Sequence, residues 1–518
     1  MNTKSDSISL SKTKRFIYSF ILLFLFYSIC LNHSFTSDQV GAWNYTHGKV
    51  SLTGIVSTLV GGRFMSAILS VIGWLFSKIG VTVYQNQYVF KLIIIAVAAY
   101  AVCKMYELFS PFLNSKIKSV VMLSILAVSF ANPYYVETFV YTGFEWSVGL
   151  LLAVWSVYLF KDKKYVRSAI VVFLAITTYQ SYVVIFLILT TVYIYLQNNA
   201  KSEKTAWISY LRMLLIAGIP AVADILIVKI SVAVMNIVNA DKIASGSMAQ
   251  TSEVKPVVMS TGIAHRIYQM CAAYFGSTCT CFGMLPFGII FIMIALMIII
   301  SLIYMIRHGK KWNEILYYLL VAAMVNAYPV AIYFVMGGES LGIVCRVVWP
   351  IFMTLAMMIM ITIYIIDDDK WLNSVIIIFS CFMLVNIYCT QTTAMDFFIS
   401  NKLDANEMNQ IEAEIERYET SSGNKIEYIE TAYTDNASEN DYNRLLCQDY
   451  QTWTFHRKTT HNSWSTVELL NYVTGENYQK KDMDKTVYNK CFAGKTWNEF
   501  ISEEQLVFDG NTMYWAIY

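Results

Sequence analysis

The sequence predicts an all-α polytopic membrane protein with about eleven transmembrane helices. Of its 518 residues, 56% are hydrophobic and only 14% are charged, whereas a soluble domain carries about 25% charged residues. The apolar residues also gather in long runs, and about 20 consecutive apolar residues are enough to cross a bilayer. Such runs lie near residues 16–32, 89–108, 117–131, 144–160, 166–180, 181–197, 211–230, 282–306, 313–335, 344–366 and 371–390.

The first apolar run follows a polar segment that ends in Lys12, Lys14 and Arg15. This arrangement is also typical of a secretory signal peptide, which needs a site of small residues for cleavage after its apolar core. Here the run ends in Cys30-Leu31-Asn32-His33, and further spans follow. We therefore expect this segment to remain as the first transmembrane helix.

Basic residues cluster in alternate connections between the predicted spans. Loops rich in Lys and Arg usually face the cytoplasm, so we predict a cytoplasmic N-terminus and an extracytoplasmic C-terminal tail. The clusters are Lys161, Lys163, Lys164 and Arg167; Lys201, Lys204 and Arg212; and Arg307, Lys310 and Lys311.

The first outer segment, residues 33–88, contains a moderately apolar stretch at 50–83 that carries charges and glycines. The predicted topology places both ends of this stretch outside. We therefore expect amphipathic helices that lie in the membrane interface rather than span it. A twelfth full span is the alternative.

The last part of the chain is polar and rich in Asn, Thr, Glu and Tyr. We predict a multi-pass transmembrane domain over residues 1–395 and an extracytoplasmic domain over residues 396–518, since about 125 residues are enough for a small domain. Within the latter, Cys447 and Cys491 either form a disulfide, as an oxidising compartment allows, or remain two buried thiols.

The charge and the cysteines exclude two classes of function. The formal net charge is +2, and a nucleic-acid-binding protein needs a basic surface to neutralise phosphates, so we expect no nucleic acid partner. The ten cysteines lack the paired spacing of a zinc site.

Candidate functional residues begin in the first outer segment. Asp38 follows the first span and has Trp43 nearby, which places a carboxylate and an aromatic ring at the outer mouth; a solvated loop acid is the alternative. Arg63 follows two glycines, which allow close approach of the backbone to a ligand, and a guanidinium binds phosphate bidentately. The alternative for Arg63 is an interfacial side chain among lipid headgroups.

The outer connection near residues 132–146 holds two acids, Glu137 and Glu145, among six aromatic residues. Sugars are held in this way, because their apolar faces pack on aromatic rings and their hydroxyls donate to carboxylates. An aromatic belt at the membrane interface is the alternative. Glu145 lies at the start of a span, where its negative charge would also interact favourably with the dipole at the helix N-terminus.

A polar hairpin tip, residues 177–182, separates two short apolar runs. Its Tyr179, Gln180 and Tyr182 need hydrogen-bond partners when buried. They either face a polar substrate at the outer membrane surface or bond neighbouring helices.

A late outer loop carries Glu339 and leads to Arg346. An arginine just inside the outer leaflet needs an anion. Asp38, Glu339 and a lipid phosphate are the three candidates for that anion.

Taken together, these features resemble the type II glucosyltransferase (Gtr) family, bacterial polytopic enzymes of the GT-C kind. The resemblance rests on the acid after the first span, the Gly62-Arg63-Phe64 step, the Tyr179-Gln180-Ser181-Tyr182 hairpin, the late Arg346 and the exterior tail. It covers residues 17 to about 420. It implies a GT-C-like fold in the bacterial cytoplasmic (inner) membrane, with the chemistry on the extracytoplasmic side.

The resemblance further implies transfer of a glucosyl or other hexosyl group from a polyprenyl-phosphate donor to a cell-surface polysaccharide, such as O-antigen on its lipid carrier. The partners would be the donor lipid, the glycan acceptor and membrane lipids, with a donor synthase and a flippase acting upstream. A lipid-linked donor suits the residues, because an isoprenoid needs an apolar groove and its phosphate needs interfacial cations. The sequence also lacks a phosphate-binding loop for a nucleotide sugar.

In the expected mechanism, Asp38 is the preferred general base toward the acceptor hydroxyl, a contribution of about 10²–10⁴-fold. Arg63 and Arg346 would stabilise the departing phosphate, and Trp43, Tyr179, Gln180, Tyr182 and Glu339 would contact substrate. Glu137 or Glu145 would orient sugar hydroxyls or replace Asp38 as the base. We expect no cofactor, although the three acids are equally able to bind a divalent metal.

Two other functions stay open at this point. A flippase or transporter of lipid-linked oligosaccharides would also combine many spans with polar groups, but would favour internal repeats and broken helices, and the sequence has only seven prolines. A polysaccharide polymerase would use similar lipid-linked substrates.

Overall fold

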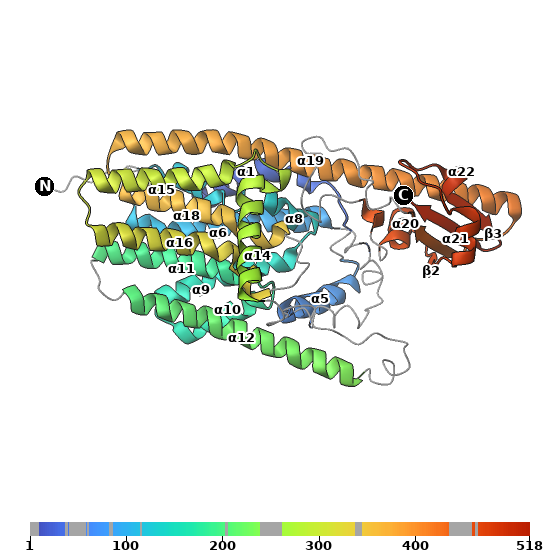
Figure 1. The fold of residues 1–518 in the computed structure, drawn as a ribbon, viewed down its shortest axis with the longest axis horizontal. Helices are drawn as coiled ribbons and strands as arrows, with labels where there is room; N and C mark the ends of the chain where they lie inside the picture. Colours follow the sequence, from blue (N-terminus) through green and yellow to red (C-terminus); the bar gives the residue numbers. More distant parts are fainter. Residues whose placement is uncertain are drawn as a thin grey trace.

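Long helices running side by side make up most of the computed structural model (Figure 1). It describes residues 10–36, 40, 59, 62–81, 86–113, 117–201, 206–238, 262–336, 344–434, 458–461 and 465–518. The helices before the C-terminal region are α1 (Lys12–Tyr27), α5 (Phe64–Ser77), α6 (Gln87–Phe109), α7 (Ser119–Ala127), α8 (Val136–Val140), α9 (Phe144–Lys161), α10 (Tyr165–Ile176), α11 (Tyr182–Lys201), α12 (Ala206–Val238), α14 (Ile263–Phe275), α15 (Ile289–Arg307), α16 (Trp312–Met336), α17 (Cys345–Val348), α18 (Pro350–Ile365) and α19 (Asp369–Ser422).

Within the described ranges, eight helical stretches are long and apolar enough to cross a membrane, which confirms the predicted helical membrane protein. Three predicted spans, 16–32, 117–131 and 166–180, are instead shorter helices of 16, 9 and 12 residues. At about 1.5 Å per residue, none of the three covers a hydrocarbon core of about 30 Å. Eleven full-length spans are therefore not shown. The eight stretches are Gln87–Phe112, Phe144–Lys161, Tyr182–Asn199, Ala206–Ile237, Ile289–Arg307, Trp312–Phe334, Cys345–Ile365 and Asp369–Ser422.

Helices α5 and α14 are not among the eight stretches. Helix α5 has 14 residues and many exposed apolar side chains, including Ile72 and Leu75. It is too short to cross the bilayer, as expected for an interfacial helix, although most of residues 50–61 lie outside the described part. Helix α14 runs across the bundle, nearly perpendicular to the other helices (Figure 1), and also exposes apolar residues such as Ile263 and Tyr268.

The start of α1, where Arg15 contacts Tyr106 near the end of α6, and the C-terminal domain lie at opposite ends of the bundle (Figure 1). The short connections at 162–164 and 308–311, which carry predicted cytoplasmic lysines, lie at the N-terminal end. We call the other end the domain end, because it faces the C-terminal domain. The assignment of the domain end to the extracytoplasmic side stays a prediction from the basic loops.

Helix α19 joins the bundle to the C-terminal domain. It begins where the Asp368 side chain caps the amides of Lys370 and Trp371, and it ends at Gly423 with a φ of 77°. Its 54 residues correspond to about 80 Å of unbroken helix. The predicted domain boundary at 395/396 falls inside this helix, and that boundary stays a prediction.

The C-terminal domain contains a four-stranded sheet, which the sequence analysis did not predict. The strand order is β2-β1-β4-β3; β1 pairs in parallel with both β2 and β4, and β3 pairs antiparallel with β4. Trp515 on β4 is fully buried in its core. The elements are β1 (Tyr428–Tyr433), α20 (Thr466–Thr474), β2 (Gln479–Asp482), α21 (Lys485–Cys491), α22 (Ser502–Gln505), β3 (Leu506–Asp509) and β4 (Thr512–Ile517).

The first outer segment enters the core of this domain. Phe35 and Val40 are 5% and 0% exposed and belong to the same apolar cluster as Ile411, Ile429 and Trp515. The Val40 amide also donates to the Thr36 carbonyl. The domain is therefore built partly from residues that follow the first helix.

Hydrogen bonds reinforce this attachment. The Asn401 side chain on α19 accepts from the amide of Phe35 at 3.0 Å and donates to its carbonyl at 3.1 Å. The Tyr472 hydroxyl lies 2.8 Å from His33 Nε2, and burial raises the pKa of Tyr472 to about 12, so this phenol keeps its proton. On the bundle side, the fully buried Lys91 donates to the Asn32 carbonyl and the Ser34 hydroxyl, both at 2.7 Å.

Replacement of Asn401 by alanine is expected to loosen the first outer segment. Two buried backbone groups of Phe35 would lose their partner, at about 1–3 kcal/mol for each. The expected result is a lower thermal midpoint of the purified protein in detergent, with Asn511→Ala, at an exposed asparagine, as the control. Equal midpoints for Asn401→Ala and the control would contradict the attachment.

Candidate functional site

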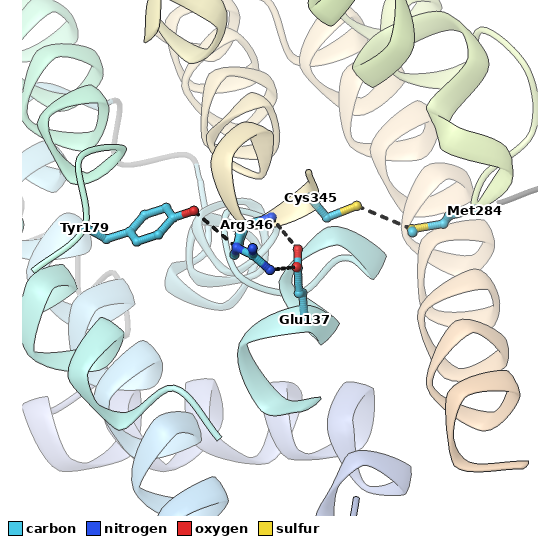
Figure 2. Close-up of polar contacts among 5 residues, drawn as sticks. All are labelled: Glu137, Tyr179, Met284, Cys345 and Arg346. Carbon is cyan, nitrogen blue, oxygen red and sulfur yellow. Dashed lines mark hydrogen bonds and ion pairs between the residues drawn. The ribbon is translucent and has the colours of Figure 1, made fainter. Parts of the chain in front are cut away.

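Glu137 and Arg346 form an ion pair at the domain end of the bundle, drawn in Figure 2. Glu137 Oε1 lies 2.6 Å from Arg346 Nη1, and Glu137 Oε2 accepts from the Arg346 backbone amide at 2.6 Å. The glutamate side chain is 0% exposed and the arginine side chain 21%. The sequence analysis suggested Asp38, Glu339 or a lipid phosphate as the anion that pairs with Arg346. In the structure, the ion-pair partner of Arg346 is Glu137 instead.

Local sequence explains how the two segments meet. Asn132 and Pro133 begin a tight turn in which the Asn132 side chain accepts from the Tyr135 amide, and this turn leads into α8 with Glu137. Pro350, at the first position of α18, follows Trp349, whose ring packs on Tyr135 at 5.1 Å between centroids. The apolar contact holds the Arg346 segment against the Glu137 segment.

Tyr179 connects the two arginines of the site. Arg346 Nε donates to the Tyr179 hydroxyl at 3.2 Å (Figure 2), and the Arg63 guanidinium lies over the Tyr179 ring, 4.7 Å from its centroid. Arg346 also lies over the ring of Tyr141 at 5.0 Å. The structure thus brings together Arg63, Glu137, Tyr179 and Arg346, which the sequence identified separately.

The hairpin tip positions Arg63 through the backbone of α5. The Met65 amide donates to the Thr177 carbonyl at 3.0 Å, and the Ser66 hydroxyl donates to the Thr178 carbonyl at 2.8 Å. Amides in the first turn of a helix lack partners within the helix, so the hairpin supplies an acceptor. Arg63 Nε is buried and has no hydrogen-bond partner among the residues that the structure describes.

Gln180 lies against a buried acid, Asp224, that the sequence analysis missed. The Gln180 side chain donates to the Asp224 carboxylate, and Asp224, on α12, is 5% exposed. Gly62 fits against both, with a φ of +73°; an added Cβ would lie 2.8 Å from Gln180 Nε2 and 3.0 Å from Asp224 Oδ2. Asp224 is an acid inside the predicted span 211–230, and an acid at that depth is itself a signal of function.

Glu145 and Tyr182, the remaining predicted site residues that the structure describes, lie beside this group. Glu145 is in the first turn of α9 and is close enough to Arg63 for electrostatic attraction. Tyr182 begins α11, is 3% exposed and packs so tightly on α9 that a Cβ at Gly149 would lie 2.6 Å from its ring. Tyr182 therefore shapes the wall behind the hairpin.

Cys491, one of the two cysteines considered for a disulfide, is a half-buried free thiol. Asp38, Trp43, Glu339 and Cys447 lie outside the described residues. Their roles stay predictions. Thr36 and Val40, on either side of Asp38 in the chain, are both buried. In the described ranges, no three His, Cys, Asp or Glu side chains come together in a way that could hold a metal ion.

Comparison with known proteins gives the family. Residues 50–363 match the glucosyl transferase GtrII family, and this range is well over half of the chain. The protein belongs to the GtrII glucosyltransferase family. The matched range includes Arg63, Glu137, Tyr179, Asp224 and Arg346, and it begins after Asp38. No curated protein and no solved structure matches the chain.

As a member of the GtrII family, the protein is a membrane glucosyltransferase. Its site combines two guanidinium groups that meet on one tyrosine with three acids, of which Glu137 holds Arg346. Two cations that contact the same tyrosine suit a phosphate group, and the remaining acids suit sugar hydroxyls or a proton to be removed.

Proposed function

We propose that the protein transfers a glucosyl group from a polyprenyl-phosphate-linked donor to a cell-surface polysaccharide, such as O-antigen on its lipid carrier. The reaction takes place at the domain end of the bundle, on the extracytoplasmic side of the bacterial cytoplasmic membrane. Membership of the GtrII family supports the glucosyl group, and the arginines support the phosphate-linked donor.

The observation that carries this proposal is the state of Arg63. Its Nε is buried without a hydrogen-bond partner among the described residues, and its guanidinium lies over the Tyr179 ring, whereas Arg346 is already fixed by Glu137. An arginine held by a ring face keeps its donors available for an anion. The donor phosphate is an anion that an interfacial site of this kind accepts.

In the proposed mechanism, Arg63 and Arg346 stabilise the negative charge that develops on the phosphate as the glucosyl bond breaks. A phosphate monoester is stable as an anion, so no acid is needed for its departure. Asp38 removes the proton from the acceptor hydroxyl. Glu145, beside Arg63, is the second candidate for this base, because both oxygens of Glu137 hold Arg346.

The experiment measures transfer of radiolabelled glucose from polyprenyl-phosphate-glucose to extracted cell-surface glycan. Membranes carry either the wild type or Asp38→Asn at equal expression. We expect transfer by the wild type and a loss of about 10²–10⁴-fold in the variant, the range of general-base catalysis. Full activity of Asp38→Asn would move the base to Glu145, which Glu145→Gln then tests.

The same assay separates the alternative functions. Absence of transfer from any polyprenyl-phosphate-hexose would reject the proposed donor. Formation of long products from preassembled repeat units, without transfer of single glucose residues, would favour a polymerase.

A further inference from the structure

The mechanism above leaves the buried acid of α12 without a role. Asp224 is 5% exposed, and its Oδ1 has no hydrogen-bond partner within the described ranges. Gln180 donates to the same carboxylate. Buried polar atoms in proteins are nearly always satisfied, and an acid within a membrane helix is costly, so the unpartnered oxygen needs an explanation.

The position of Asp224 relative to Arg63 supplies one. Gly62 and Arg63 are consecutive residues, and they face the consecutive residues Gln180 and Tyr179. Gly62 fits against Gln180 and Asp224, while the Arg63 guanidinium lies on the Tyr179 ring. The carboxylate and the guanidinium thus lie beside adjacent residues of the same two segments.

This arrangement of a carboxylate near a guanidinium suits a sugar phosphate. The anomeric carbon of the donor sugar is joined directly to the phosphate, so a phosphate bound by Arg63 brings the sugar hydroxyls near Arg63's neighbours. A carboxylate oxygen accepts a hydroxyl proton in a charge-assisted hydrogen bond, and Gln180 fixes the direction in which the carboxylate points.

We propose that Asp224, oriented by Gln180, accepts a hydrogen bond from a hydroxyl of the glucosyl group, so that the two residues form the donor-sugar subsite. This inference rests on the proposed function, because it assumes that Arg63 holds the donor phosphate. Asp224 then determines which sugar is bound. Arg63 contributes equally to the binding of any lipid that carries the phosphate.

The test compares the binding of two lipids to purified protein in nanodiscs. One lipid is polyprenyl-phosphate-glucose and the other is polyprenyl phosphate without sugar. We expect Asp224→Asn to weaken binding of the glucose lipid by on the order of 10-fold or more, the loss typical of one hydrogen bond to a charged group, and to leave binding of the sugar-free lipid unchanged. Arg63→Gln is expected to weaken binding of both lipids.

Deoxy analogues of the donor identify the hydroxyl. If Asp224 contacts one hydroxyl, the donor that lacks this group binds wild type and Asp224→Asn with equal affinity, while the other deoxy donors still distinguish them. Gln180→Leu is expected to give the same pattern more weakly, because it acts through the orientation of Asp224.

Folding is followed by the thermal midpoint of each variant, with Asp224→Ala as a second substitution. Removal of an acid from a membrane helix is expected to leave the midpoint unchanged or raised. A purely structural role predicts the reverse: a lower midpoint and equal effects on both lipids. That result would overturn the subsite.

The failures of the two proposals are distinguishable. If the wild type binds neither lipid, the proposed donor is wrong and the subsite falls with it. If the wild type binds both lipids with equal affinity, the phosphate site stands and the sugar subsite alone is rejected.

Discussion

Arg63→Gln is expected to reduce glucosyl transfer by about 10²–10³-fold, the loss typical of removing one preorganised group that stabilises developing charge. Glutamine keeps polar donors and much of the length of the side chain, but it removes the positive charge over Tyr179. The effect should fall on kcat as well as on KM, because the phosphate becomes more negative as the glucosyl bond breaks. Initial rates at varied donor concentration measure this.

Arg15→Gln is the matched control. The Arg15 guanidinium lies over the Tyr106 ring at 4.7 Å, the same distance as in the Arg63–Tyr179 pair, but Arg15 lies near the start of α1, at the other end of the bundle. Loss of a cation–π contact alone would affect both variants in the same way. Equal activity of Arg63→Gln and Arg15→Gln would show that Arg63 has no role in catalysis.

Separation of Glu137 from Arg346 is expected to have the largest effect on stability. Arg346→Met leaves the carboxylate of a 0% exposed glutamate without this arginine, and breaking a buried pair from one side costs about 3–5 kcal/mol. Glu137→Leu should cost less, because the Arg346 side chain is 21% exposed and reaches water. Thermal or denaturant unfolding in detergent shows which of the two variants is less stable.

The double variant Glu137→Leu/Arg346→Met distinguishes folding from catalysis. Apolar replacement of both partners is often nearly neutral for stability, so the double variant should regain most of the lost stability while transfer stays abolished. Arg417→Met is the control, since its pair with Glu414 leaves Arg417 70% exposed and is worth about 0–1 kcal/mol. Recovery of transfer in the double variant would show that the pair is only structural.

Hydropathy predicted the membrane part of the fold well, because a bilayer imposes a length and a composition on each span. It overestimated the length of the segments near 16–32, 117–131 and 166–180. In 166–180 the helix stops at Ile176 because the polar hairpin tip begins there. In 117–131 the chain turns after Ala127, and apolar residues continue through the turn. Val128, Phe130 and Ala131 follow α7 and are buried in the protein, so their hydropathy reflects packing rather than lipid.

Arg63, Glu137, Glu145 and Arg346 could be singled out one by one, because arginines and acids at the ends of spans are rare enough to be noticed. Their pairing was not predictable, since Glu137 and Arg346 are 209 residues apart in the chain. Asp224 was missed because a single acid hardly lowers the mean hydropathy of the predicted span 211–230. The sheet was missed because strands of four to six residues give too short an alternation to stand out.

The contacts of Phe35 and His33 have a consequence for biosynthesis. Phe35 bonds Asn401, which is 366 residues later in the chain, and His33 contacts Tyr472, which is 439 residues later. Contacts between such distant residues form late, because the intervening chain must be made before they can close. His33 and Phe35 are therefore fastened only when translation is nearly complete. Under the proposed function, in which the nearby Asp38 is the base, a ribosome-bound or truncated chain would not transfer glucose.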